Sequence, residues 1–220
     1  MHTPYKAIIF DLDGTLLDTL ADIADTMNAV LLGLGLPTHP RQAYKQFVGD
    51  GVAKCAERVL PADRRDAATI EFCKEAFLVR YANAWKKQTR PYPGIEELLR
   101  RCHTSQLRMG VCTNKPHEVA VETLHHFFAP DTFEHVQGVV DHLPRKPNPA
   151  MLRGLLGHFA LNHTQVVYVG DTATDMRTAK GAACFSVGVT WGFRHEHELR
   201  EQGADLIIHH PRELQHWLGI

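Results

Sequence analysis

Asp11 and Asp13 are the residues whose type and spacing first suggest chemistry, because they directly follow the apolar residues 6–10. Two carboxylates separated by one residue, where a buried strand passes into a loop, can point toward one site and act there as nucleophile, general acid or metal ligands. Gly14 allows a tight backbone turn immediately beyond them. Aspartate and glycine are also ordinary turn residues, so this pair alone leaves an acidic surface turn and a catalytic site both open.

Short apolar runs recur along the chain and predict the strands that would position such a site. Besides residues 6–10, the predicted strands are residues 109–113, 136–140, 165–169, 183–187 and 205–208. Helix-like stretches such as residues 94–103 and 117–128 separate most of them. This alternation predicts an α/β fold built on a doubly wound, mainly parallel sheet. Since such sheets bind ligands at the carboxyl ends of their strands, the residues just after each run are expected to carry the chemistry.

Residues 19–85 depart from this alternation. Apolar residues recur there at helical spacing over residues 20–34 and again over residues 70–85, and no strand pattern occurs. We therefore predict an all-helical insert within a catalytic core. The predicted boundaries are residues 18–86 for the insert, and residues 1–17 together with 87–220 for the core.

Composition and charge exclude several functional classes. Of the 220 residues, 44% are hydrophobic and 22% are charged, as in globular chains. The formal net charge of −1 gives no field that would recruit nucleic acid or an anionic membrane. No apolar run approaches the roughly 20 residues that span a bilayer, and the first residues lack the pattern of a signal peptide. Five scattered cysteines without a Cys-x-x-Cys pair fit reduced thiols, so we expect a cytoplasmic monomer or homodimer without nucleic-acid or membrane partners.

The segment Asp-x-Asp-Gly-Thr at residues 11–15, after an apolar strand, resembles the first motif of the haloacid dehalogenase superfamily. The superfamily's three further motifs are matched in order, each at or beyond the end of a predicted strand: Thr113-Asn114, Lys146-Pro147-Asn148-Pro149, and Gly170-Asp171 followed by Asp175. Arg145 departs from the pattern, since relatives often carry glycine before the lysine. The resemblance covers essentially the whole chain and implies a Rossmann-like core, with the helical insert as the cap of these enzymes.

The resemblance implies phosphoryl transfer through an aspartyl-phosphate. It makes Asp11 the nucleophile, and Asp13 the general acid toward the leaving alkoxide and then the base that activates water. Thr113 and Asn114, together with Lys146, would hold the transferring phosphoryl oxygens. Dehalogenases of the superfamily lack a carboxylate two residues after the nucleophile, so Asp13 indicates a phosphatase or a phosphomutase.

Electrostatics favour a divalent cation among these residues. Four aspartates and one lysine give the cluster a formal charge of −3, which would repel a phosphate unless a cation intervened. Hard oxygen donors together with a phosphate suit Mg²⁺. By resemblance, Asp11 and Asp171 bind it through their side chains and Asp13 through its backbone carbonyl. Asp175 would orient a metal-bound water or Lys146.

Residues 47–52 resemble the glycine-rich cap loop of the phosphoglycolate phosphatases within this superfamily. Backbone amides from Gly49 to Gly51 would meet a small carboxylate there, with Lys45 or Lys54 as a counter-charge. A plain helix–loop–helix turn is the alternative. Caps of this kind exclude water and select the substrate, and one this compact indicates a small phosphorylated metabolite rather than a phosphoprotein.

The sequence therefore predicts a Mg²⁺-dependent phosphomonoester hydrolase that resembles the phosphoglycolate phosphatases and acts on a small phosphorylated metabolite. Two alternatives stay open. A phosphomutase of the β-phosphoglucomutase type would share all four motifs and the cap. A non-catalytic phosphate-binding or regulatory protein on the same fold would use the site only for binding.

Overall fold

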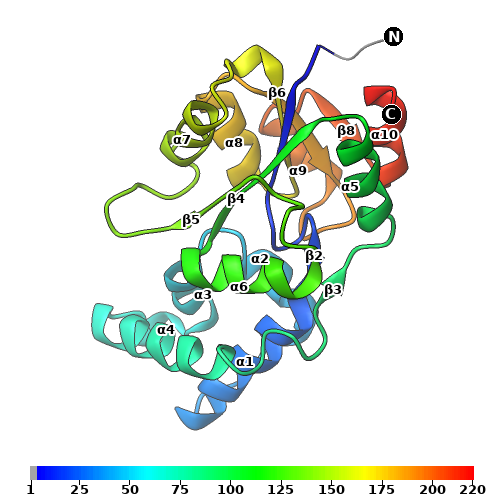
Figure 1. Cartoon of the computed structure of the whole chain (residues 1–220). Helices are drawn as coiled ribbons and strands as arrows, with labels where there is room; N and C mark the ends of the chain where they lie inside the picture. Colours follow the sequence, from blue (N-terminus) through cyan, green and yellow to red (C-terminus); the bar gives the residue numbers. More distant parts are fainter. Residues whose placement is uncertain (1–3) are drawn as a thin grey trace. The chain divides into compact units, whose positions relative to one another are not determined.

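The computed structural model describes residues 4–220, and the chain divides into two compact units (Figure 1). We call Met1–Leu17 with Pro91–Ile220 the core unit, and Asp18–Arg90 the helical unit. The second boundary therefore falls between residues 90 and 91, somewhat later than the expected position after residue 86. Two short strands at the boundaries, β2 (Leu17–Asp18) and β3 (Arg90–Pro91), form a separate two-stranded sheet.

The core unit is built on one six-stranded sheet in the order β5-β4-β1-β6-β7-β8, with every neighbouring pair parallel. The strands are β1 (Ala7–Phe10), β4 (Arg108–Pro116), β5 (His135–Val139), β6 (Val166–Gly170), β7 (Phe185–Val189) and β8 (Leu206–Ile208). The predicted doubly wound α/β fold is therefore confirmed. Strand β1 lies in the middle of the sheet and is fully buried, which explains its unbroken apolar run.

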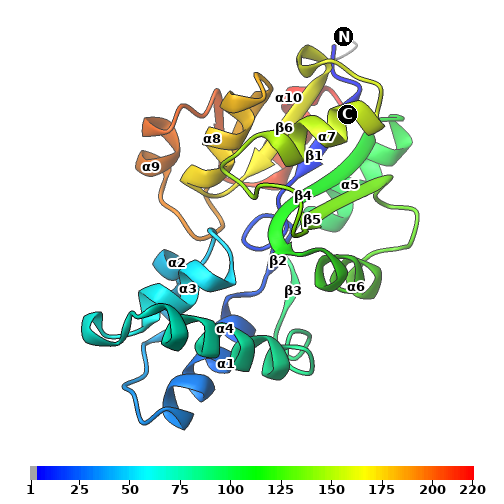
Figure 2. The same ribbon diagram turned by 90° about the vertical axis from the view of Figure 1, so that its left-hand side faces the viewer.

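Helices cover both faces of this sheet, as Figure 2 shows. Ile8 and Phe10 of β1 face a cluster that includes side chains of α5 (Ile95–Thr104), α6 (His117–Phe127) and α10 (Pro211–Leu218). The alternate residues, Ala7 and Ile9, face a second cluster with α7 (Ala150–His158) and α8 (Ala173–Gly181). Because side chains alternate along a strand, a short apolar run serves both layers at once. Helix α9 (Glu196–Glu201) lies between β7 and β8 in the chain.

The helical unit packs α1 (Leu20–Gly33) against α4 (Ala67–Tyr81) and contains no strand of the large sheet. Two shorter helices, α2 (Tyr44–Phe47) and α3 (Val52–Val59), connect them. The predicted second long helix ends earlier than its apolar spacing suggested, because Trp85 lies in the turns after α4 although it is buried. Asp22 fixes the returning chain, since it accepts hydrogen bonds from the backbone of residues 88 and 89.

Three short 3-10 helices complete the described secondary structure: η1 (Arg41–Ala43), η2 (Ala62–Arg64) and η3 (His163–Gln165). Over residues 4–220, no helix has the length and apolar character needed to cross a bilayer. All five cysteines are buried and unpaired.

Candidate active site

Asp11 is the first residue beyond β1, at the carboxyl edge of the sheet. Its backbone N–H donates to the carbonyl of Val169 on β6 at 2.8 Å, so the parallel pairing continues one step past the strand. The chain then turns sharply: Gly14 has a φ of +89°, and its N–H donates to Leu17 O at 2.9 Å. Since β1 and β6 are parallel, the segments that follow them meet at the same edge.

Three buried carboxylates gather there, those of Asp11, Asp171 and Asp175. One oxygen of each lies within 4.8 Å of the others. Asp175 is held by the first turn of α8, because Thr172 donates to Asp175 Oδ2 from its backbone N–H at 3.0 Å and from its hydroxyl at 2.7 Å. Asp175 Oδ1 is thereby aimed at the ammonium of Lys146, 2.7 Å away.

Asp171 is packed between glycines. Its Oδ1 accepts the Thr15 hydroxyl at 3.1 Å, and its Oδ2 accepts the Phe193 N–H at 2.8 Å. A Cβ at Gly14 would lie 2.3 Å from Asp171 Oδ2, and a Cβ at Gly192 would lie 2.4 Å from the same oxygen. The carboxylate therefore needs glycine on both sides. The sequence suggested only the tight turn at Gly14, and the need at Gly192 follows from a contact between distant segments.

Lys146 is the buried cation of this cluster, with a side chain only 1% exposed. Its Nζ lies 2.9 Å from Asp11 Oδ1 and donates to the Cys112 carbonyl and the Tyr168 hydroxyl, each at 3.0 Å. Burial by itself lowers the pKa of Lys146, but the charges of Asp11 and Asp175 outweigh it, and the pKa lies above its usual value. The lysine is therefore firmly charged.

The three buried carboxyl groups outnumber the single ammonium of Lys146. Burial and the charge of Asp175 raise the pKa of Asp11 to about 7, against the opposing effect of Lys146. Burial, and then the charges of Asp175 and Asp11, raise the pKa of Asp171 well above its usual value. A divalent cation among these oxygens would favour the ionised forms. The donor set, hard carboxylate oxygens with an excess of negative charge, fits Mg²⁺.

Thr113 and Asn114 lie near the end of β4, beside these residues. The Thr113 hydroxyl oxygen accepts the backbone N–H of Lys115 at 3.3 Å, which leaves the hydroxyl hydrogen for another acceptor. Asn114 donates from Nδ2 to the Lys146 carbonyl at 3.1 Å and so fixes the backbone that carries the lysine. The structure thus brings the second and third motifs together, as the resemblance requires.

Lys115 was missed by the sequence analysis. Its ammonium contacts both carboxylate oxygens of Asp13, at 3.0 and 3.1 Å. With this second lysine, the group of four aspartates carries a formal charge of −2 rather than −3. No local signal marked Lys115, because the alternation of faces along a strand does not hold across the irregularity of β4 between Cys112 and Pro116.

The predicted cap-loop residues belong to the helical unit. Gly49 and Gly51 have φ values of +119° and +88°, which only glycine adopts readily, and Gly51 directly precedes α3. Arg58 was also missed by the sequence analysis. Its guanidinium holds the loop in place, because it forms an ion pair with Asp50 at 2.5 Å and donates a hydrogen bond to the Phe47 carbonyl at 3.0 Å. Lys54 forms an ion pair with Glu57 at 2.6 Å. Contact of Gly49, Gly51 or Lys45 with a substrate stays a prediction.

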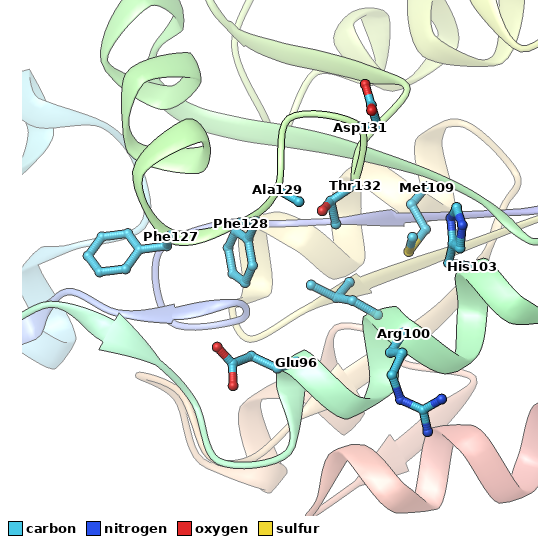
Figure 3. Close-up of a pocket in the computed structure, with 10 residues that line it drawn as sticks. Glu96, Arg100, His103, Met109, Phe127, Phe128, Ala129, Asp131 and Thr132 are labelled. Atoms are coloured by element: carbon cyan, nitrogen blue, oxygen red, sulfur yellow. The ribbon is translucent and has the colours of Figure 1, made fainter.

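The core unit also contains a pocket of about 470 Å³ that includes none of the predicted site residues (Figure 3). Its wall combines residues of α5, such as Glu96, with Phe127 and Phe128 at the end of α6. Both acidic and basic groups border it. The pocket offers no concentrated charge comparable to the carboxylate cluster.

A family model described as haloacid dehalogenase-like hydrolase matches residues 8–189. The chain belongs to this family. Phosphoglycolate phosphatase of Neisseria meningitidis serogroup A is 37% identical over 193 residues, which are 86% of this chain and 81% of that protein. The protein of the same name from Cereibacter sphaeroides is 35% identical over 220 residues, or 96% of this chain and 99% of that one.

The solved structures agree with this family membership. The crystal structure of a predicted phosphoglycolate phosphatase from Haemophilus somnus 129pt superimposes with a TM-score of 0.88 at 27% identity, over 98% of both chains. The resemblance to phosphoglycolate phosphatases and the predicted class of enzyme, a phosphatase, are thereby confirmed. In this hydrolase family, the acidic cluster is the natural candidate for the active site.

Proposed function

We propose that this chain is a Mg²⁺-dependent phosphomonoester hydrolase of a small phosphorylated metabolite, with 2-phosphoglycolate as the first substrate to test. The observation that carries the proposal is the buried cluster of Asp11, Asp171 and Asp175 around Lys146 at the carboxyl edge of the sheet. Each of these residues occupies a family motif. The choice of substrate rests on the names of the relatives and on the predicted cap loop at Gly49 and Gly51.

Asp11 is the proposed nucleophile, and its two oxygens differ. Oδ1 accepts the Leu12 N–H at 2.7 Å and lies 2.9 Å from Lys146 Nζ. Within residues 4–220, no hydrogen bond or ion pair reaches Oδ2. Oδ2 therefore attacks the phosphorus atom, forming an aspartyl-phosphate as the bond from phosphorus to the leaving oxygen breaks. Asp13 gives its proton to the leaving alkoxide and, in the second step, takes one from the water that attacks the aspartyl-phosphate.

The positively charged and hydrogen-donating groups neutralise the transferring phosphoryl oxygens. Lys146 and the Thr113 hydroxyl are the proposed donors, with Asn114 alongside. Mg²⁺, held by the side chains of Asp11 and Asp171 and the carbonyl of Asp13, would offset the repulsion between nucleophile and phosphate. Asp175 keeps Lys146 in place.

The proposed cellular location is the cytoplasm, supported by the five buried, unpaired thiols. Burial raises the pKa of the Cys55 and Cys102 thiols to about 12, so these thiols stay protonated and unreactive.

The test is phosphate release by the purified full chain from a panel of 2-phosphoglycolate, hexose phosphates, nucleoside monophosphates and pyrophosphate. We expect release with Mg²⁺ and none in EDTA, and restoration when Mg²⁺ is returned. Asp11→Asn should lower kcat to below about one thousandth while leaving the fold intact. Activity of this variant above a few per cent would contradict the nucleophile, and activity in EDTA would contradict the metal. Isomerisation of a hexose 1-phosphate would identify a phosphomutase, and binding without turnover a non-catalytic protein.

A further inference from the structure

Lys115 holds the Asp13 carboxylate through both of its oxygens, although it belongs to none of the residues that the four motifs assign. The distances from Nζ are 3.0 Å to Oδ1 and 3.1 Å to Oδ2. The lysine side chain is 5% exposed and that of Asp13 is 16% exposed, whereas the surface pair of Lys54 and Glu57 is 44% and 37% exposed. Removing both charges from water has a cost that a buried pair barely recovers. Stability alone is therefore a poor explanation for this pair.

The same residue also orients Thr113. The backbone N–H of Lys115 donates to the Thr113 hydroxyl oxygen at 3.3 Å. One residue thus fixes a proposed phosphoryl-binding hydroxyl through its backbone and the proposed general acid through its side chain. Neither contact requires the lysine to touch the phosphate.

An irregularity in the sheet places Lys115 where it is. Between Cys112 and Pro116 of β4, three residues lie opposite the single residue Gly138 of β5, the strand beside it in Figure 2. Such bulges re-aim side chains and are frequent beside active sites. A Cβ at Gly138 would lie 2.8 Å from the Lys115 carbonyl and 2.5 Å from the Cα of His117. Glycine at this position is what allows the bulged chain to come so close.

We propose that Lys115 is a positioning residue that holds the Asp13 side chain in the orientation needed for proton transfer to the leaving group. The inference rests on the proposed function, because the role of Asp13 belongs to it. When the bond from phosphorus to the leaving oxygen breaks, the alkoxide takes the proton of Asp13 and a carboxylate remains. The ion pair between Lys115 and Asp13 in the structure shows how the ammonium then holds this carboxylate.

This role predicts a dependence on the leaving group. An alkoxide must be protonated as it departs, whereas p-nitrophenolate departs readily as an anion. Loss of an oriented Asp13 should therefore lower kcat/KM, which reports phosphoryl transfer to Asp11, for an alkyl phosphate and leave it almost unchanged for p-nitrophenyl phosphate. The second step, in which Asp13 acts as the base on water, is common to both substrates and lies outside this quantity. A structural role, or a direct contact with the phosphoryl group, would slow both substrates alike.

The experiment compares Lys115→Met, Lys115→Arg and the wild type, with Mg²⁺ present, on p-nitrophenyl phosphate and on the best alkyl phosphate of the panel. For Lys115→Met, kcat/KM on the alkyl phosphate should fall about 10- to 100-fold, a part of what general acid–base catalysis contributes. On p-nitrophenyl phosphate kcat/KM should fall less than about threefold. Lys115→Arg should recover part of the loss.

Lys74→Met is the matched control, because Lys74 forms a surface ion pair with Glu71 at 2.6 Å. It should leave the ratio of the two kcat/KM values unchanged. This ratio is measured on one sample, so a partly unfolded variant still gives a valid result. In an Asp13→Ala background, Lys115→Met should cause no further loss on the alkyl phosphate, since the lysine acts through Asp13.

An unchanged ratio in Lys115→Met, or a further loss in the Asp13→Ala background, would overturn the positioning role. Failure of the proposed function would look different. In that case the wild type itself would release no phosphate from any ester.

Discussion

Replacement of Lys146 by methionine removes the only cation that touches both Asp11 and Asp175 among the described residues. Methionine keeps an unbranched apolar chain of similar length, so the change is chiefly one of charge and hydrogen bonding. The lost contacts are two ion pairs, at 2.9 and 2.7 Å, and two hydrogen bonds, to Cys112 O and the Tyr168 hydroxyl. All of these groups are buried, so water cannot take the place of the ammonium.

The expected loss of stability follows from the burial. Removing one partner of a buried ion pair typically costs about 3–5 kcal/mol, since the other charge is left uncompensated. For a chain of this length, about 1 kcal/mol corresponds to about 2–4 °C in melting temperature. Lys146→Met should therefore lower the melting temperature by about 6–20 °C. The surface variant Lys74→Met should lose about 0–1 kcal/mol, or at most about 4 °C.

The assay is thermal unfolding followed by circular dichroism, in EDTA so that no metal replaces the lost charge. A second substitution, Asp175→Asn, is then added to each protein. In the Lys146→Met background it removes an unpaired charge and should restore part of the stability, with a coupling of about 0.5–3 kcal/mol. Equal melting temperatures for Lys146→Met and Lys74→Met, or strictly additive effects in the double variant, would refute the reasoning.

Two further predictions concern the metal and the glycines. Because the folded-state pKa of Asp11, about 7, lies above its usual value, its contribution to the stability of the metal-free protein is complete below about pH 4 and is lost as pH rises through about 7. Mg²⁺ should therefore raise the melting temperature more at about pH 8 than at about pH 5, and equal shifts would contradict this. Gly14→Ala should lower the melting temperature and abolish the Mg²⁺ shift, because its Cβ would lie 2.3 Å from Asp171 Oδ2 at a φ of +89°. Gly33→Ala, where a Cβ meets nothing within 4 Å, is the control and should be neutral or stabilising.

The sequence was informative wherever local pattern and function coincide. The buried strand before Asp11 and the helical spacing of the insert are local signals, and the structure has both elements. Lys115 was not found, because its importance depends on a bulge that packing against Gly138 creates. Gly192 and Arg58 were missed for the same reason, since each acts on a segment that the chain brings close only when folded.

At Trp85 the apolar spacing predicted a helix that the structure does not have. Its apolar side chain continues the helical spacing of α4, yet the helix ends at Tyr81 and the indole is buried from a turn. Periodicity reports which side chains are buried, and a turn can bury one as well as a helix can. The boundary of an element is therefore less certain from sequence than its existence.

Asp175 both stabilises the first turn of a helix and positions a buried lysine. One oxygen closes the first turn of α8 with Thr172, and the other holds the ammonium of Lys146. Winding of that turn and positioning of the Lys146 ammonium are consequently a single folding event. A chain in which the start of α8 frays has lost the carboxylate that aims its lysine, so the first turn of this helix governs whether the site exists at all.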